Sequence, residues 1–234
     1  MNKELSEVLK IYSTGSHVEF TTRLFNSSKE TLVALFIDIL TMYINDRNSS
    51  TIREYLTVTI AGYEHSEGKI GFNGFKQSSI VDGKPIACEA KPKNFNTNDL
   101  EKYREGGRKT KPSSLNGGGN FTDYTFARLS KDKRVDPHML VSGFVDGKLI
   151  YLIEFPFRTK SFTDTLYRQL IKRFPDGKDR SGEFLRSASF DYRDYSEAHK
   201  ITPVYVLPKQ ALGEYKKYIS QKFYDFLLSL LRHE

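Results

Sequence analysis

The chain has 234 residues, a formal net charge of +7 and a single cysteine, Cys88. This length suits one domain over residues 1–234, with a helical N-terminal part over residues 1–50 packed on the core. One cysteine excludes an intrachain disulfide, and no apolar leader segment follows Met1, so we expect a cytoplasmic protein that spans no membrane. The basic charge favours an anionic partner, of which nucleic acid is the commonest.

Two helices are predicted in the N-terminal part. Residues 3–12 carry apolar side chains at helical spacing. Ser27 and Glu30 form a capping-box pattern that opens a second helix over residues 29–43. This second segment is apolar nearly all round, so we expect it to be buried.

The hydrophobic period then changes from that of a helix to that of a strand. Residues 55–61 alternate as Tyr-Leu-Thr-Val-Thr-Ile-Ala and predict a strand. Residues 69–81 predict a second strand and residues 84–91 a third. Three consecutive strands of this kind predict an antiparallel meander.

A helix is predicted next, over residues 97–105, because Thr97, Asn98 and Asp99 can cap its start and Gly106-Gly107 can end it. The glycine-rich stretch 108–123 is predicted to be a loop. Residues 139–144 and 148–157 are predicted to pair as a hairpin across Asp146-Gly147.

The last part of the chain predicts a helix over residues 163–174, an irregular stretch over 175–200, a strand over 201–207 and an amphipathic helix over 212–231. The complete order of elements predicts an α/β fold in which a mixed central β-sheet is flanked by helices.

The segment most informative about function is 82–91, Asp-Gly-Lys-Pro-Ile-Ala-Cys-Glu-Ala-Lys. Strand side chains alternate between faces, so Cys88 and Ala90 would point one way while Glu89 and Lys91 point the other. Magnesium prefers oxygen ligands, and a metal-bound water becomes a nucleophile at neutral pH. A carboxylate beside an ammonium on a buried strand therefore predicts a metal-assisted hydrolytic site.

This pattern resembles the signature of the PD-(D/E)xK nuclease superfamily, to which most restriction endonucleases belong. The resemblance implies a restriction-endonuclease-like core, Mg²⁺ as the cofactor, and hydrolysis of phosphodiester bonds in double-stranded DNA. It implies that Asp82, Glu89 and Lys91 are catalytic, that Asp82 and Glu89 hold the metal, and that Lys91 lies against the nucleophile. An additional metal-binding acid ahead of the motif, Glu67, is also implied.

The leading acid of the motif stays open between Asp82, Glu64, Glu67 and Glu154. Asp82-Gly83 is also a good two-residue hairpin turn, which would place Asp82 far from Glu89. Glu154, the only charge in an apolar strand, is either solvated at an edge or turned towards the site.

Residues predicted to bind DNA are basic or amide-bearing and follow the motif. They are Lys93, Arg108, Lys109, Lys111, Asn116, Asn120, Thr122, Arg186 and Arg193. Lysine and arginine contact phosphates, whereas asparagine and threonine suit base edges. Three of the cations, Arg108, Lys109 and Lys111, have no acidic neighbours nearby in the sequence. For the basic residues the alternative is a solvated helix face with ion pairs, and for the glycine run 117–119 it is a flexible linker.

Other chemistries lack their motifs, since no P-loop, no zinc-ligand spacing and no Gly-x-Ser-x-Gly elbow is present. Within the resemblance, we predict a stand-alone type II restriction endonuclease. It would act as a homodimer, so that two sites cut the two strands of a symmetric target. The alternatives are a nicking or repair endonuclease of the same fold, and a non-catalytic nucleic-acid-binding protein in which Glu89 and Lys91 form a surface ion pair.

Overall fold

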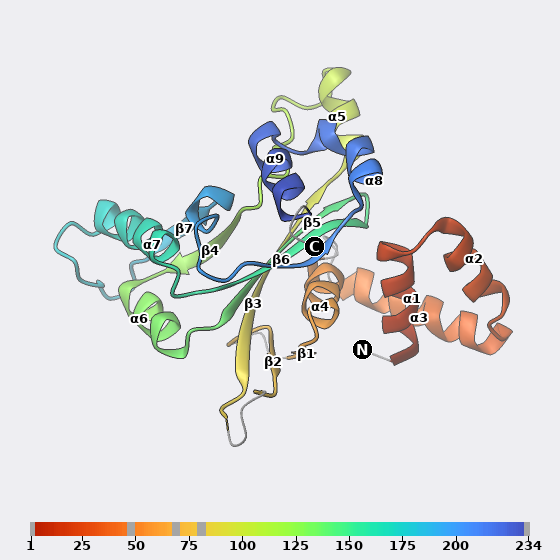
Figure 1. The fold of residues 1–234 in the computed structure, drawn as a ribbon, viewed down its shortest axis with the longest axis horizontal. Coiled ribbons are helices and arrows are strands. Elements are labelled where there is room, and N and C mark those ends of the chain that lie inside the picture. The colour runs from red at the N-terminus through yellow and green to blue at the C-terminus, as the bar shows by residue number, and fades with distance from the viewer. Residues whose placement is uncertain (1–2, 46–49, 67–70, 79–82, 232–234) are drawn as a thin grey trace.

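The computed structural model describes residues 3–45, 50–66, 71–78 and 83–231, which form a mixed α/β fold around a central sheet (Figure 1). The described strands of that sheet lie in the order β1-β2-β3-β5-β6-β8. Their bounds are β1 (Glu64–His65), β2 (Gly74–Lys76), β3 (Ile86–Phe95), β5 (His138–Val145), β6 (Lys148–Pro156) and β8 (Thr202–Val206). Neighbouring strands are antiparallel except β3 and β5, which are parallel. The predicted mixed central sheet is confirmed.

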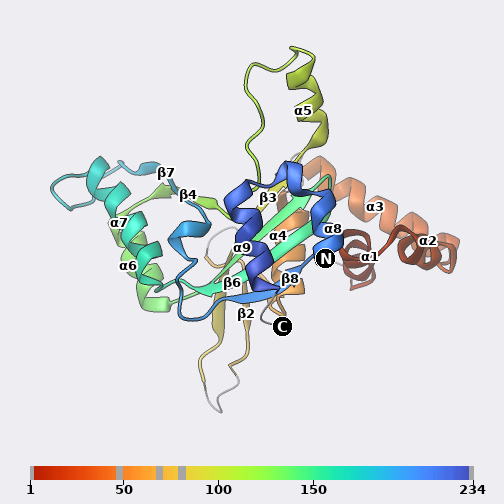
Figure 2. The same cartoon turned by 45° about the horizontal axis from the view of Figure 1, so that its top comes forward.

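Two further strands, β4 (Gly119–Tyr124) and β7 (Leu185–Phe190), pair antiparallel in a small second sheet. The bounds of the helices are α1 (Lys3–Thr14), α2 (His17–Phe25), α3 (Lys29–Asn45), α4 (Ser50–Ile60), α5 (Thr97–Arg104), α6 (Phe126–Val135), α7 (Lys160–Arg173), α8 (Lys209–Glu214) and α9 (Gln221–Leu230), with short 3-10 turns η1 (Tyr192–Asp194) and η2 (Lys216–Tyr218). Helices cover both faces of the central sheet, and α1, α2 and α3 form a separate group to one side of it, as Figures 1 and 2 show. None of these described helices is long and apolar enough to cross a bilayer.

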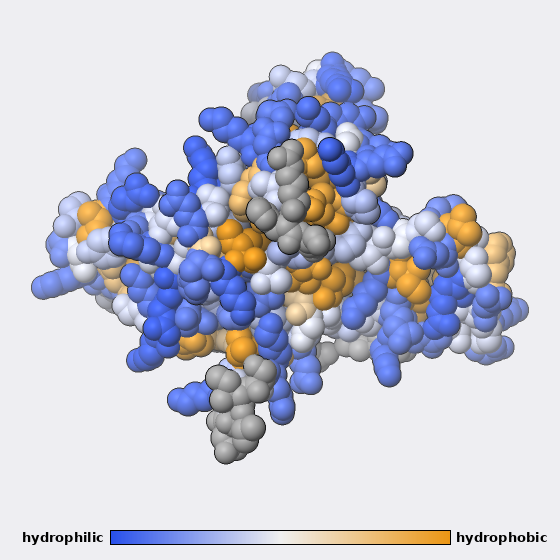
Figure 3. Space-filling view, in the orientation of Figure 1, coloured by the Kyte–Doolittle hydropathy of each residue, from blue (hydrophilic) through white to orange (hydrophobic). Residues whose placement is uncertain are grey.

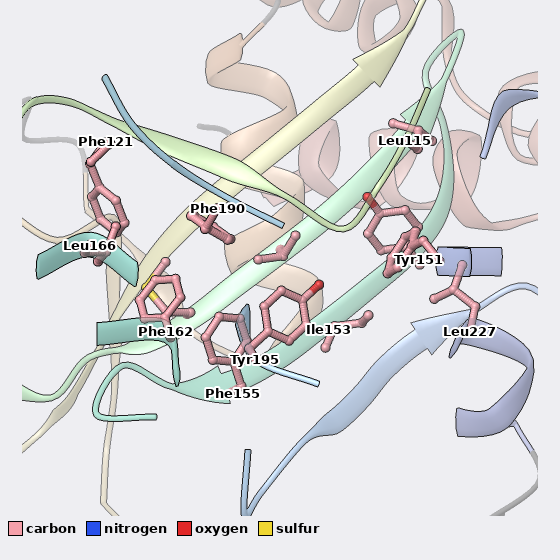
Figure 4. Packing of buried hydrophobic residues seen from close by; sticks show 14 of the residues in the cluster. Leu115, Phe121, Tyr151, Ile153, Phe155, Phe162, Leu166, Phe190, Tyr195 and Leu227 are labelled. Carbon is pink, nitrogen blue, oxygen red and sulfur yellow. The ribbon is translucent and has the colours of Figure 1, made fainter. Parts of the chain in front are cut away.

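The main hydrophobic core lies between the central sheet and the layer formed by β4, β7, α7 and α9. Figure 4 shows this packing, with aromatic side chains from both layers facing one another. The rings of Phe155 and Tyr195 stack at 4.1 Å, and Phe162 meets Phe190 edge-on at 4.9 Å. The second face of the sheet packs on α4 through a smaller cluster that includes Val58 and Leu140.

Helix α4 replaces the strand that we predicted over residues 55–61, so that prediction was wrong. The hydroxyls of Thr57 and Thr59 donate to the carbonyls of Arg53 and Tyr55, one turn earlier, at 2.7 and 2.9 Å. A hydrogen bond of 2.6 Å then joins Thr57 Oγ1 to Ser142 Oγ on β5. Tertiary packing therefore overrides the strand preference of β-branched residues.

Helix α3 forms where it was predicted, but its expected burial is wrong. Several apolar side chains of this helix are exposed to solvent, among them Phe36 with 65% and Ile37 with 55% exposed. The N-terminal helices form the group at the right of Figure 1, and Figure 3 shows apolar patches over it. The group contacts the core through α1, where Leu9 packs against a cluster that contains Phe144 and Leu149.

Three other segments differ from the predictions. The expected loop 108–123 ends in β4, and the expected irregular stretch 175–200 contains β7, since these two segments pair with each other over a long sequence separation. The expected continuous helix 212–231 is divided into α8, η2 and α9, because Ile219 leaves the helical conformation to bridge to Leu115.

Candidate active site on strand β3

Strand β3 separates its side chains as the sequence predicts. Cys88 and Ala90 are buried in the cluster against α4. Glu89 and Lys91 project from the other face, towards β4 and α6. This alternation confirms the predicted pairing of a carboxylate and an ammonium on one face of a strand.

Glu89 and Lys91 form a close, shielded ion pair. Lys91 Nζ donates to Glu89 Oε1 at 2.6 Å, and the two side chains are only 16% and 8% exposed. Lys91 Nζ also lies 4.4 Å from the centre of the Phe121 ring, within the range of a cation–π contact. Asn73 holds the strand in place, because its Oδ1 accepts from Ala90 N and its own N–H donates to Cys88 O.

A second cation reaches the same carboxylate from α6, a helix that the sequence reading missed. Arg128 Nη2 lies 3.5 Å from Glu89 Oε1, and Arg128 Nε lies 3.9 Å from Asp132 Oδ2. Thr125 caps α6 by accepting from the Arg128 N–H. The Thr125 cap and the i,i+4 spacing of Arg128 and Asp132 are the sequence signals that would have predicted this helix and its ion pair.

Asp132 is the other carboxylate of the site, and it is 5% exposed. The hydroxyl of Tyr124 donates to Asp132 Oδ2 at 3.1 Å. Burial raises the pKa of Asp132 above its ordinary value, although Tyr124 and Arg128 act in the opposite direction. The negative charge of Glu89 adds to that rise.

These groups border a cavity of about 470 Å³ that is lined by Gly71, Phe72, Glu89, Ala127, Arg128, Lys131 and Asp132. Three cations (Lys91, Arg128 and Lys131) and two carboxylates (Glu89 and Asp132) meet at or beside it, so the site carries one excess positive charge. Such a cavity favours an anionic ligand.

The donor set allows a metal ligand at Glu89 but is incomplete in the described residues. Both cations approach Oε1 of Glu89, and Oε2 accepts no hydrogen bond from the described part of the chain. Within residues 3–45, 50–66, 71–78 and 83–231, no group of three or more His, Cys, Asp or Glu side chains converges there. The predicted ligands Asp82 and Glu67 lie outside the described residues, and Glu64 is exposed on β1.

Glu154 is neither solvated at a sheet edge nor turned towards the Glu89 site, which were the two positions that we considered for it. It projects to the opposite face of the sheet from Glu89 and is 9% exposed. Its Oε1 accepts from Tyr63 at 2.8 Å and Lys76 at 3.1 Å, and it also contacts His138 Nδ1. These hydrogen bonds outweigh the effect of burial and lower the pKa of Glu154 to about 2. Glu154 is therefore part of a separate buried network.

The predicted DNA-binding residues that come first in the chain lie in two groups, one on β3 and one after α5. Lys93 continues the Glu89–Lys91 row on β3, and its Nζ donates to Asn116 Oδ1 at 3.0 Å. Burial lowers the pKa of Lys93. Arg108 does have an acidic partner, contrary to expectation, because Asp99 lies 2.5 Å away across the turn after α5. Lys109 and Lys111 are exposed beyond it.

The remaining predicted residues lie on or near the small second sheet. Asn120 and Thr122 are exposed on β4, and Arg186 is exposed on β7. Arg193 pairs with Asp191 at 2.5 Å. A cavity of about 500 Å³ brings Asn116 and Arg193 together, away from Glu89, with Arg168 and Lys172 also in its lining.

Gly119 allows β4 to cross β3 directly over Lys91. A Cβ added at Gly119 would lie 2.8 Å from Lys91 Cβ and 3.0 Å from Phe190 Cζ. We expect Gly119→Ala to cost about 1–3 kcal/mol in the free energy of unfolding, measured with urea, because both neighbours must shift. Gly107→Ala is the matched control, since its Cβ would meet only Lys102 O at 3.4 Å. Equal stability of the two variants would show that β4 does not press on Lys91.

Comparison with known proteins adds no assignment: no protein-family model matches the chain, and no curated protein matches it.

Proposed function

We propose that this protein is a Mg²⁺-dependent endonuclease that hydrolyses phosphodiester bonds of double-stranded DNA. Its class would be that of the PD-(D/E)xK nucleases, and its role that of a type II restriction endonuclease. The observation that carries the proposal is the Glu89–Lys91 pair, joined at 2.6 Å on one face of β3 and shielded beside a cationic cavity.

Each residue of the pair has a role in this reaction. Glu89 would hold the metal through Oε2, the oxygen that takes no hydrogen bond from the described residues. Bound Mg²⁺ would supply an acidified water and neutralise charge on the phosphate. Lys91, fixed by Glu89 and by the Phe121 ring, would orient the attacking water and stabilise the charge that grows on the phosphate oxygens.

The fold supports the same class of protein. The antiparallel strands β1, β2 and β3 are followed by β5, parallel to β3, and by its hairpin partner β6. The mixed sheet agrees with the core that we expected, although the predicted first strand of the meander, residues 55–61, is helix α4 and the two-residue strand β1 precedes β2 instead.

The charge distribution supports an anionic polymer as the substrate. The net charge is +7, and Lys109 and Lys111 are exposed, without ion-pair partners among the described residues. Lysines of this kind would contact backbone phosphates and make binding weaker at higher salt.

Digestion of supercoiled plasmid in Mg²⁺, with EDTA as the control, tests the proposal. Discrete linear fragments in Mg²⁺ alone support a restriction endonuclease. Nicked circles support a nicking or repair enzyme of the same fold, and unchanged DNA contradicts the nuclease proposal. Sedimentation equilibrium separately tests the predicted homodimer, whose mass would be twice the 27.0 kDa of one chain.

A further inference from the structure

Arg128 is held over the candidate site by contacts that fix its guanidinium group. The group lies 5.6 Å from the centre of the Phe121 ring and 5.5 Å from that of Tyr124. Arg128 Nη1 donates to the Thr122 carbonyl at 3.2 Å. The two rings and the backbone oxygen together restrict the side chain, which is still 37% exposed.

Most hydrogen-bond donors of Arg128 are unused. A guanidinium group has five N–H donors, and the bond to Thr122 O is the one that Arg128 makes from its side chain to the described residues. Its carboxylate neighbours lie at 3.5 Å and 3.9 Å, which is attraction at ion-pair range without a well-formed hydrogen bond. The remaining donors can therefore form a fork for a phosphate.

Asp132 sets the position of this fork from one turn further along α6. Its carboxylate is buried, is held by the Tyr124 hydroxyl, and faces Arg128 Nε. Because the Tyr124 hydroxyl fixes the buried Asp132 carboxylate, Asp132 can hold the flexible Arg128 side chain in one position. Tyr124 therefore acts on Arg128 in two ways, through its ring and through Asp132.

We propose that Arg128 binds the phosphate that is cut, and that Asp132 positions Arg128 for this contact. The inference rests on the proposed function, since it adds a phosphate ligand to the Glu89–Lys91 site. It also agrees with the cationic lining of the cavity, which favours an anionic ligand. Bidentate contact of this kind depends on the planar fork, so lysine cannot replace it fully.

Single-turnover cleavage of DNA tests the role of Arg128. We expect Arg128→Ala to lower the rate about 100-fold and Arg128→Lys about 10-fold. Guanidinium ion added at millimolar concentration is expected to restore part of the rate of Arg128→Ala and to leave the other variants unchanged. Arg134→Ala is the matched control, because Arg134 is exposed on the same helix and has no ion pair within the described residues.

Asp132→Asn tests the positioning role. We expect it to lower the rate about 10-fold on its own and to add nothing in the Arg128→Ala background, because the two residues act through one contact. Additive effects of the two changes would contradict positioning. Cleavage by Arg128→Ala within about twofold of the unmodified protein, with no response to guanidinium, would overturn the inference.

A protein that cuts no DNA would contradict the proposed function but still leave the anion contact measurable. Inorganic phosphate is then titrated while the side-chain Nε–H signal of Arg128 is followed by NMR. A saturable shift that disappears in Arg128→Lys supports the contact, and the absence of a shift overturns it.

Discussion

Glu89→Gln and Lys91→Met are each expected to lower the single-turnover rate of DNA cleavage by about 1,000-fold or more, while the chain stays folded. Glutamine keeps the shape of Glu89 but removes the anionic ligand. Methionine keeps an unbranched apolar side chain but removes the ammonium that contacts Glu89 Oε1 at 2.6 Å and lies over the Phe121 ring. Cleavage is measured with enzyme in excess over DNA, and DNA binding by fluorescence anisotropy in Ca²⁺.

An exposed ion pair supplies the matched control for this experiment. Lys160 and Asp164 are joined at 2.7 Å on α7, with side chains 91% and 49% exposed. We expect Lys160→Met and Asp164→Asn to cut DNA at the rate of the unmodified protein, since exposed pairs contribute little. Cleavage at the normal rate by either Glu89→Gln or Lys91→Met would contradict a catalytic role for the pair.

Glu154→Ala is expected to lower the free energy of unfolding by about 3–5 kcal/mol, because it leaves the buried Tyr63 and the partly buried Lys76 and His138 without their acceptor. Tyr63, Lys76 and His138 come from three separate segments and meet on one oxygen of Glu154. Urea denaturation measures the loss. Glu101→Ala on the exposed side of α5 is the control, and an equal, small effect of both changes would show that the network does not stabilise the fold.

The same network predicts a specific dependence of stability on pH. The pKa of Glu154 is about 2 in the folded chain against an ordinary value of 4.5, so its ionised form stabilises the folded state. This contribution, about 3 kcal/mol, is fully present above pH 4.5 and is lost as the pH falls towards 2. Urea unfolding across that range is expected to show a shallower loss for Glu154→Gln than for the unmodified chain. Parallel pH profiles would contradict the assignment.

Local sequence patterns predicted the elements whose structure depends on near neighbours. The alternation around Glu89 placed its side chain opposite Cys88, and the Asp146-Gly147 turn joined β5 to β6. Both follow from the two-residue period of a strand and from the turn preference of Asp-Gly. Helix α5 formed at its predicted start, although Asn96 caps it and the predicted capping residues 97–99 form its first turn.

Elements that depend on distant partners were not predictable in this way. Strand β7 exists because Leu185–Phe190 pairs with β4, and nothing in its own sequence indicates that partner. Helix α4 carries a strand-like sequence whose threonine hydroxyls bond within the helix and to Ser142. In each case a contact over a long sequence separation decided the conformation.

The candidate site was predictable only in part for the same reason. Glu89 and Lys91 are two residues apart on one strand, so the strand period alone brings them together. Arg128 and Asp132 reach Glu89 from α6 after the chain has passed through α5 and β4. Glu154 was a candidate for the site on sequence grounds, but it belongs to a network on the other face of the sheet, which its position in an apolar strand did not reveal.

Titration of the folded protein with Mn²⁺ in the presence of duplex DNA tests the central proposal most directly, since Mn²⁺ accepts the oxygen ligands that suit Mg²⁺. Electron paramagnetic resonance of the free ion measures the binding. We expect saturable binding that Glu89→Gln abolishes and Lys91→Met preserves or strengthens, because the ammonium competes for the same carboxylate. Binding by Glu89→Gln equal to that of the unmodified protein, or no binding by either, would contradict a metal site at Glu89.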